Sequence, residues 1–339
     1  MLSPAVILIL FLRGICTIRS EGMIDRMVSK NEKNLLVFTG NWNKCLVNDT
    51  CSLSGLTLGK SDVSTFSDGE IKVDLQEEIL GCDVVIIQST SPPVNRNLIE
   101  LLFMISAARK SGAKQITAII PYFGYARQDR KPSPGSNISA SDVARMLELT
   151  GVDRVISFDL HSAMCQGFFG PRVQVDNLSV IKIFIDHLVG FNRVAVVSPD
   201  AGAYARSIQL YDIFTKKYPQ CDVSSAMIFK QRLKANELAS AQLCGDVKDR
   251  DVIIADDIVD TAGTLCKAAE ILITNGAKSV TAVITHGIFS GPALQRIRES
   301  PITRILTTDS IAHSESVLAE PKIQIISLAQ ELSRVLLSV

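Results

Sequence analysis

The chain lacks several features that mark particular classes of protein. Its charge has no excess of either sign, with 35 Lys and Arg against 35 Asp and Glu in 339 residues. Nothing therefore favours nucleic acid as a partner held by bulk charge. The eight cysteines include no CxxC pair and are too sparse for a disulfide framework, which indicates free thiols in a reducing compartment. The apolar run at residues 5–12 is too short to span a bilayer. We expect neither a nucleic acid nor a membrane as a partner.

The first 32 residues are an extension that we leave out of the fold argument. The run at residues 5–12 has the character of the apolar part of a signal peptide, but no basic stretch precedes it. Met23 and Met27 allow the functional start to lie downstream. We expect a cytoplasmic protein and leave organellar targeting by residues 1–32 open.

The rest of the chain has the pattern of an α/β protein. Hydrophobic residues make up 47% of the sequence, and 339 residues suggest about two domains. Apolar runs of strand length alternate with amphipathic helical segments; the runs lie at 84–88, 116–120, 154–158, 194–198, 251–255 and 279–284. This alternation predicts βαβ units and mainly parallel sheets flanked by helices. We expect tandem domains at 33–177 and 178–320, followed by a strand and a helix at 321–339 that pack on the first domain.

The stretch IIADDIVDTAGTLCKA, residues 253–268, joins a buried strand to a helix and carries the clearest chemistry. Ligands of parallel sheets bind beyond the carboxyl ends of the strands, where this junction lies. Backbone N–H groups at a helix N-terminus suit a phosphate, whereas Asp256 and Asp257 repel phosphate and accept hydrogen bonds from hydroxyls. A sugar phosphate with a vicinal diol satisfies both, so we expect a ribose 5-phosphate unit here. A cluster of helix-capping acids is the plainer reading, but three aspartates with Thr-Ala-Gly-Thr behind them fit it poorly.

The stretch VIIADDIVDTAGT, residues 252–264, resembles the ribose-phosphate loop of type I phosphoribosyltransferases and of ribose-phosphate diphosphokinases. Six further stretches, in order along the chain, resemble the diphosphokinases specifically: FSDGEIKV (66–73), PYFGYARQDRK (121–131), DLHSAMCQGFF (159–169), SPDAG (198–202), GDVKDRDV (245–252) and THGIFSGPA (285–293). A transferase would not need the motifs of the first domain. The resemblance covers residues 34–339 and implies an α/β fold of two tandem type I phosphoribosyltransferase-like domains.

The resemblance also implies an activity. Members of this family transfer the β,γ-diphosphoryl group of ATP to the 1-hydroxyl of ribose 5-phosphate, giving 5-phosphoribosyl 1-pyrophosphate and AMP, and they require Mg²⁺. Their nucleotide loop is presented to ATP by a neighbouring subunit, so we expect a homo-oligomer of dimers that assemble to a hexamer. A regulatory subunit without catalysis is the alternative, but such a subunit should have lost residues of the catalytic or ribose loop.

We assign the site residues by matching positions of this sequence to the motifs of the family, and several of them also have a plainer interpretation without a functional role. The resemblance implies ATP binding by Phe66, Asp68, Glu70, Arg127, Gln128 and His161, metal binding by His161 and Asp200, and catalysis by Lys230 and Arg232. It implies ribose 5-phosphate binding by Arg232, Asp256, Asp257, Asp260, Thr261, Ala262, Gly263 and Thr264. Locally, residues 66–70 read as a polar turn, His161 as a satisfied polar residue and 229–237 as a solvated basic loop.

The sequence departs from the family pattern at four places. Ala203 and Ala262 stand where glycine is usual, and Phe229 stands where a polar residue is common. Residues 131–139, KPSPGSNIS, contain two prolines and no arginine in the stretch that binds regulatory phosphate and nucleoside diphosphate in many members. We therefore expect the usual activation by orthophosphate and inhibition by diphosphate to be altered.

Overall fold

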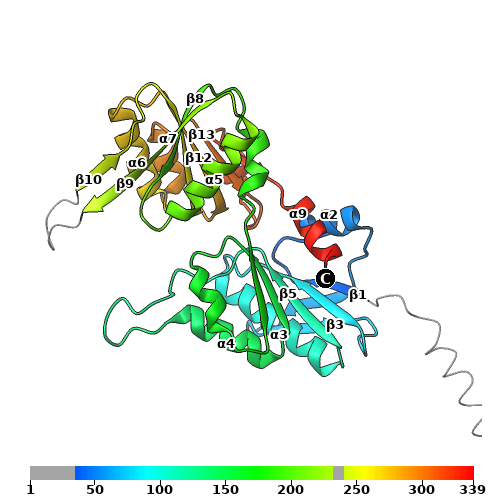
Figure 1. Cartoon of the computed structure of the whole chain (residues 1–339). Helices are drawn as coiled ribbons and strands as arrows, with labels where there is room; N and C mark the ends of the chain where they lie inside the picture. Colours follow the sequence, from blue (N-terminus) through cyan, green and yellow to red (C-terminus); the bar gives the residue numbers. More distant parts are fainter. Residues whose placement is uncertain (1–34, 232–239) are drawn as a thin grey trace, which may run out of the picture.

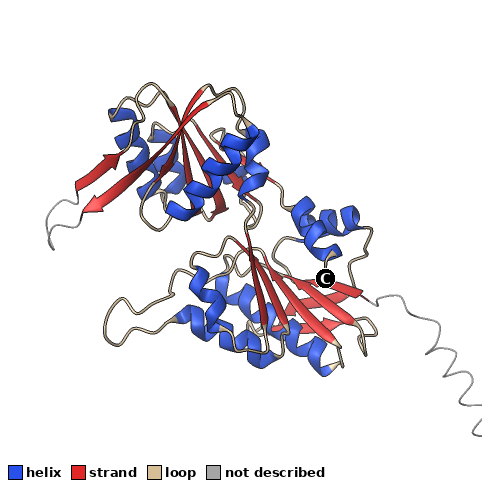
Figure 2. Ribbon diagram, in the orientation of Figure 1, coloured by secondary structure: helices blue, strands red, loops and turns tan. Residues whose placement is uncertain are grey.

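The structure is a computed structural model that describes residues 35–231 and 240–339. These residues form two α/β domains that follow one another along the chain, each built on its own sheet (Figure 1). Helices cover both faces of each sheet (Figure 2). The expected architecture of two tandem domains with mainly parallel sheets is confirmed.

The N-terminal sheet is parallel throughout, in the order β1-β4-β5-β6-β7. Its strands are β1 (Leu35–Thr39), β4 (Asp83–Ile87), β5 (Gln115–Ile120), β6 (Arg154–Phe158) and β7 (Gln174–Leu178). The central strands are runs of β-branched residues such as Val84–Ile87, because both of their faces are buried under helices.

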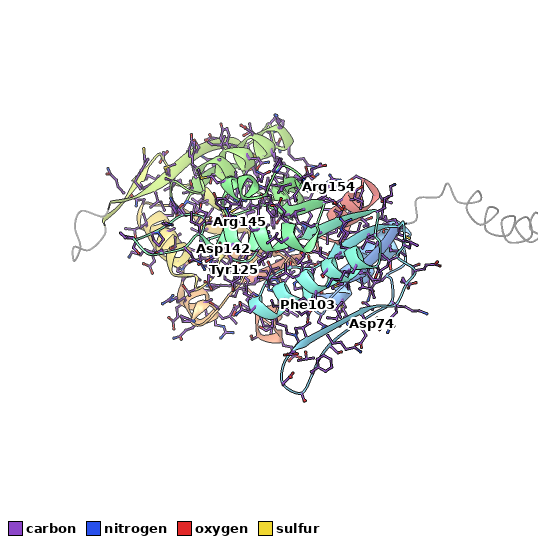
Figure 3. The ribbon with its side chains drawn as sticks, turned by 90° about the horizontal axis from the view of Figure 1, so that it is seen from below. Asp74, Phe103, Tyr125, Asp142, Arg145 and Arg154 are labelled. Atoms are coloured by element: carbon purple, nitrogen blue, oxygen red, sulfur yellow. The ribbon has the colours of Figure 1, made fainter. Side chains whose placement is uncertain are left out.

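Helical segments and a hairpin surround this sheet. One face is covered by α3 (Val94–Lys110), α4 (Ser139–Thr150) and the 3₁₀ helix η1 (Ala163–Phe168), and α2 (Lys44–Ser54) lies on the other. Helix α4 ends at Gly151, whose φ of 102° only glycine adopts without strain. The hairpin of β2 (Ser61–Thr65) and β3 (Ile71–Leu75) packs against α3, where Phe103 lies beside the strand that carries Asp74 (Figure 3). The sequence analysis did not predict this hairpin.

The C-terminal sheet has the order β10-β9-β8-β11-β12-β13-β14 and is parallel except for the β9–β10 hairpin. Its strands are β8 (Arg193–Ser198), β9 (Asp222–Gln231), β10 (Ser240–Cys244), β11 (Asp251–Val259), β12 (Ser279–Gly287), β13 (Arg304–Thr308) and β14 (Ile323–Ile326). The 3₁₀ helix η2 (Ile181–His187) and α5 (Tyr204–Lys217) cover one face, and α6 (Gly263–Thr274) and α7 (Ala293–Glu299) cover the other. A short helix, α8 (Glu315–Leu318), precedes β14.

The chain passes from one domain to the other just after β7. Leu178 still pairs in the N-terminal sheet, and Ile181 already packs in the core of the C-terminal domain. Strand β11 runs to Val259, further than the predicted 251–255, so Asp256 and Asp257 lie within the strand.

The C-terminal segment divides between the domains, whereas the sequence analysis places all of it on the first. Strand β14 pairs with β13 at the edge of the C-terminal sheet. Helix α9 (Ala329–Leu337) returns to the N-terminal domain, where Leu332 and Leu336 pack with Val47 of α2 (Figure 1). The segment therefore ties the two domains together with apolar contacts. Across residues 35–231 and 240–339, no helix has both the length and the apolar character needed to cross a membrane.

Candidate active site

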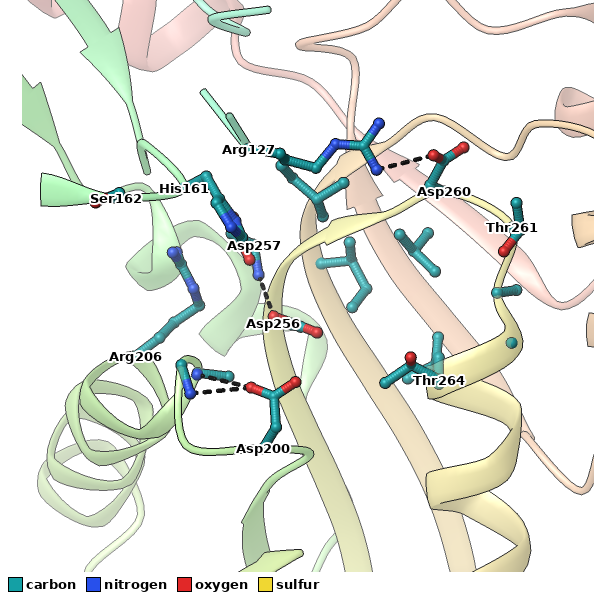
Figure 4. A pocket seen from close by; sticks show the side chains of 18 of the residues that line it. Arg127, His161, Ser162, Asp200, Arg206, Asp256, Asp257, Asp260, Thr261 and Thr264 are labelled. Atoms are coloured by element: carbon teal, nitrogen blue, oxygen red, sulfur yellow. Dashed lines mark hydrogen bonds and ion pairs between the residues drawn. The ribbon is translucent and has the colours of Figure 1, made fainter. Parts of the chain in front are cut away.

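A cavity of about 540 Å³ lies between the two domains, at the carboxyl ends of strands from both sheets. The N-terminal domain contributes the segments after β5 and β6, and the C-terminal domain contributes the turn after β8, the end of β11 and the start of α6 (Figure 4). Ten predicted positions lie in this lining: Arg127, His161, Asp200, Asp256, Asp257, Asp260, Thr261, Ala262, Gly263 and Thr264.

The end of β11 places two adjacent carboxylates at the cavity in different electrostatic environments. Burial raises the pKa of Asp256, and the nearby charge of Asp257 raises it further. Burial also opposes ionisation of Asp257, but the hydrogen bond with His161 and the charge of Arg206 outweigh it and lower the pKa of that carboxyl. Asp257 is therefore the firmly ionised member of the pair, and both carboxylates can accept hydrogen bonds from ligand hydroxyls.

His161 crosses the domain boundary to reach Asp257. Its Nδ1 lies 2.8 Å from Oδ2 of Asp257, and the two residues are 96 positions apart in sequence (Figure 4). This hydrogen bond raises the pKa of His161 above its usual value, against the opposing effect of burial. The ring thus joins the two halves of the cavity.

Arg127 and Asp260 form a second link across the cavity. Nη1 of Arg127 lies 2.8 Å from Oδ2 of Asp260 (Figure 4). The other carboxylate oxygen accepts a hydrogen bond from the Ser290 hydroxyl. Burial tends to raise the pKa of Asp260, but the Ser290 hydrogen bond and the Arg127 guanidinium together lower it. A predicted ATP contact and a predicted ribose-phosphate contact therefore meet in one ion pair.

The start of α6 has the form of a phosphate-binding turn. Helix α6 begins at Gly263, and the N–H groups of its first turn have no helical acceptor, so they suit an anion. Ala262 has a φ of 59°, a left-handed conformation that explains why glycine is usual at this position. Arg296 of α7 donates to the Thr261 carbonyl at 3.0 Å and so holds the turn from behind.

Asp200 shapes the turn between β8 and α5. Its Oδ1 accepts hydrogen bonds from the backbone N–H groups of Gly202 at 3.0 Å and Ala203 at 3.2 Å. Ala203 has a φ of −85°, which any residue adopts, so the backbone of this turn does not require glycine at that position.

The donor set fits a magnesium ion held jointly with substrate. Asp200, Asp256 and Asp257 bring oxygen atoms to one cavity. The pKa of Asp256 is raised first by burial and then by the negative charge of its neighbours, and a bound cation would offset that negative charge. In the described part of the chain, no three His, Cys, Asp or Glu side chains are arranged to enclose a metal by themselves. Magnesium is commonly bound through one or two carboxylates, waters and substrate phosphates, which matches this incomplete set.

Four predicted ATP residues lie outside the cavity lining. Phe66, Asp68 and Glu70 lie at the tip of the β2–β3 hairpin, and the Phe66 side chain is 55% exposed. Gln128 accepts a hydrogen bond from the Ser139 hydroxyl at the start of α4, and its neighbour Asp129 lines the cavity instead. Within a single chain, the hairpin tip and the cavity are therefore separate.

The catalytic-loop prediction falls partly outside the described residues. Lys230 is paired with Ala241 in the β9–β10 hairpin, next to Gln231, the last described residue of β9. Arg232 lies outside the described residues.

The sequence analysis missed Asp129, Arg206 and Arg296. Asp129 and Arg206 line the cavity, and Arg296 supports its phosphate-binding turn. Asp129 lies beside the predicted Gln128, and Arg206 lies six residues after Asp200, so proximity to a motif was the available signal. Arg296 follows the motif at 285–293 and had no chemical signal of its own.

Comparison with known proteins gives the family. Residues 35–151 match the N-terminal domain of ribose phosphate pyrophosphokinase, and residues 216–337 match the phosphoribosyl synthetase-associated domain. The chain is 46% identical over 308 residues to ribose-phosphate pyrophosphokinase of Burkholderia pseudomallei, covering 89% of this chain and 94% of the relative. It is 43% identical over 302 residues to ribose-phosphate pyrophosphokinase A of Dictyostelium discoideum, covering 88% and 92%.

A solved structure agrees with these relatives. The crystal structure of phosphoribosylpyrophosphate synthetase from Mycobacterium smegmatis superposes with a TM-score of 0.81 at 33% identity, covering 90% of this chain and 98% of the other. The predicted resemblance is confirmed over nearly the whole chain. The chain belongs to the ribose-phosphate pyrophosphokinase family, also called the ribose-phosphate diphosphokinases.

Proposed function

We propose that this protein transfers the diphosphoryl group of ATP to the 1-hydroxyl of ribose 5-phosphate, giving 5-phosphoribosyl 1-pyrophosphate and AMP for nucleotide biosynthesis. The observation that carries the proposal is the interdomain cavity. One side presents adjacent carboxylates and a helix N-terminus from the C-terminal domain, and the other presents Arg127 and His161 from the N-terminal domain. A sugar phosphate and a nucleotide polyphosphate can thus meet between the domains.

The C-terminal side holds ribose 5-phosphate in this proposal. The N–H groups at the start of α6 and the hydroxyls of Thr261 and Thr264 take the 5-phosphate, while Asp256 and Asp257 accept hydrogen bonds from the ribose diol. Asp257 suits this role because the net lowering of its pKa keeps it charged, although burial alone would oppose ionisation.

The N-terminal side and the catalytic loop act on ATP. The 1-hydroxyl oxygen of ribose attacks the β-phosphorus, the bond from that phosphorus to the α-phosphate oxygen breaks, AMP leaves with the electron pair, and the hydroxyl proton is released to solvent. Arg127 leaves its ion pair with Asp260 and binds an ATP phosphate instead. Lys230 and Arg232 stabilise the charge on the transferring group. Such transfers depend mostly on positioning and on charge stabilisation.

Magnesium is the cofactor in this proposal, with Asp200 and His161 as the residues that would hold it. When bound, the ion would neutralise ATP phosphate charge and help to orient the transferring group. Nδ1 of His161 is engaged by Asp257, so only Nε2 remains for a metal or a phosphate.

A second copy of the chain completes the adenine site in this proposal. Phe66, Asp68 and Glu70 lie on an exposed hairpin tip away from the cavity of their own chain, which supports their action in a neighbour. Dimers that assemble to a hexamer are the expected homo-oligomer. Mixing Phe66→Ala and Lys230→Ala subunits should restore activity at roughly a quarter of the sites, because one hybrid site has both parts intact. Mixtures no more active than either variant alone would contradict sharing.

The direct test follows AMP release by the chain starting at Met27, mixed with Mg²⁺, ATP and ribose 5-phosphate. Equimolar AMP and 5-phosphoribosyl 1-pyrophosphate are expected. A folded protein that binds ATP but releases no AMP would favour the regulatory-subunit alternative. Varying orthophosphate in the same assay tests the altered stretch at residues 131–139.

A reducing compartment, with the cytoplasm as first expectation, is the location that we propose. The seven cysteines in the described residues are all free thiols, which supports such a compartment. Fractionation of cells expressing the chain with and without residues 1–32 tests whether that segment directs it to an organelle.

A further inference from the structure

A buried band of polar side chains joins the carboxyl ends of the two sheets beneath the cavity. We call it the interdomain seam; its members are Ser89, Asp159, Arg206, Thr285, His286 and Ser310. From the N-terminal domain, the Ser89 hydroxyl donates to the Ser310 carbonyl at 2.7 Å. From the C-terminal domain, Nε2 of His286 lies 3.0 Å from the Phe158 carbonyl and Nδ1 lies 2.8 Å from the Ser310 hydroxyl. Directional hydrogen bonds thus cross the boundary in both directions.

Asp159 is the charged centre of the seam. It follows β6 and is 6% exposed, and both of its carboxylate oxygens are engaged. Oδ2 accepts from the Thr285 hydroxyl of β12 at 2.8 Å and from the backbone N–H of Val180 in the interdomain connection at 3.2 Å. Oδ1 lies 2.9 Å from Nη1 of Arg206 on α5. One carboxylate therefore contacts the connection between the domains and two elements of the C-terminal domain.

The backbone of Asp159 is held as firmly as its side chain. Its φ is 41°, in the left-handed region that non-glycine residues seldom adopt and that persists where the surroundings determine it. Two residues later the chain places His161 at the cavity, and Arg206, the ion-pair partner of Asp159, also lines the cavity. The seam thus lies directly under groups that face the substrates.

The relation between the domains matters because each holds a different substrate. The proposed ribose 5-phosphate contacts at 256–264 belong to the C-terminal domain, whereas Arg127 and His161 belong to the N-terminal domain. A small shift of one domain would separate the hydroxyl from the phosphorus without disturbing either set of contacts. A misplacement of about 1 Å can lower a rate ~100-fold.

We propose that Asp159 is a positioning residue for the transfer, holding the nucleotide side of the cavity in register with the ribose side through Arg206, Thr285 and Val180. This inference rests on the proposed function. The apolar contacts of α9 also join the domains, but apolar surfaces tolerate sliding more readily than a charged, directional network does. Removing one link of the seam should therefore affect turnover more than substrate binding.

The test uses a mild seam variant and a matched control. Thr285→Val removes the hydroxyl that binds Asp159 while keeping the side-chain shape. Thr39→Val removes a hydroxyl that is equally buried and bonded at 2.8 Å, to the Ile87 carbonyl, but lies inside the N-terminal sheet. We expect Thr285→Val to lower kcat by ~10-fold or more with the KM for ribose 5-phosphate near the wild-type value. The kcat of Thr39→Val should stay near that of wild type.

A second pair repeats the comparison with serine. Ser310→Ala removes a seam hydroxyl, and Ser157→Ala removes a buried hydroxyl that donates to the Ile120 carbonyl within the N-terminal sheet. A folded Thr285→Val and a folded Ser310→Ala with wild-type kcat would overturn the proposal. So would equal losses of kcat in the seam variants and their controls, since these would indicate a general structural role.

Calorimetry tests the join between the domains without any assay of activity. Asp159→Asn keeps the shape of the side chain and removes the charge that pairs with Arg206. Wild type should melt in one transition, and Asp159→Asn should melt in two as the domains uncouple. A single, unshifted transition would overturn the joining role. Absence of turnover in the wild type would count against the proposed function instead, so the two failures are distinguishable.

Discussion

Replacing Asp257 by asparagine should weaken the binding of ribose 5-phosphate. Asp257 is 8% exposed, and its Oδ2 lies 2.8 Å from Nδ1 of His161, so the carboxylate is already oriented toward the cavity. Asparagine keeps the size of the side chain but removes the charge that strengthens a hydrogen bond from a ribose hydroxyl. A hydrogen bond to a charged group contributes about 1.5–3 kcal/mol, so the KM for ribose 5-phosphate should rise roughly 10- to 150-fold.

The assay is AMP release at saturating ATP with ribose 5-phosphate varied, and melting curves establish that the variant is folded. Asp251→Asn is the matched control, because Asp251 begins the same strand and binds the Ser279 hydroxyl at 2.7 Å at the opposite end of the sheet. Its KM should match that of wild type. A folded Asp257→Asn with unchanged KM for ribose 5-phosphate would refute the assignment of Asp257 to the diol.

Three further predictions concern catalysis, backbone strain and pH. Lys230→Ala should lower kcat ~100-fold or more while ATP binding, measured by calorimetry, stays intact; turnover within a few-fold of wild type would contradict the role of the loop. Ala262→Gly removes the cost of a left-handed alanine, roughly 1–2 kcal/mol, but lowers the free energy of the unfolded chain by about 0.4–1 kcal/mol, so the free energy of unfolding in urea should rise by up to about 1.6 kcal/mol and should not fall. Burial lowers the pKa of His286 and of His313, so the unfolded chain binds more protons than the folded one just below pH ~6.5. The raised pKa values of His161 and Asp256 act in the opposite direction, so the test is the difference between wild type and His313→Gln. The free energy of unfolding of wild type relative to His313→Gln should decrease from pH 7 to pH 5, by at most ~1.4 kcal/mol per pH unit; a difference that rises on acidification would contradict it.

The strands and helices that frame the site were predictable because their signals are local. Strand β6 was predicted at 154–158 and observed there, since a buried run bounded by polar residues needs no distant partner to be recognised. The end of β11 was not, because Asp256 and Asp257 look like turn residues until their pairing with β12 is known. The β2–β3 hairpin was missed for a related reason. Its strands alternate weakly and are stabilised by packing on α3, which is a long-range contact.

The sequence by itself determined the family, the two-domain α/β architecture and the residue types that suit a sugar phosphate, because spaced motifs and hydrophobic periodicity are properties of short segments. Only the tertiary structure decided which of these residues meet. His161 reaches Asp257 across 96 positions and Arg127 reaches Asp260 across 133. It likewise separated Phe66 from the cavity of its own chain and placed Asp159 beneath that cavity, in an ion pair with Arg206 of its lining. These relations depend on how two independently patterned sheets are joined, and no local segment encodes that geometry.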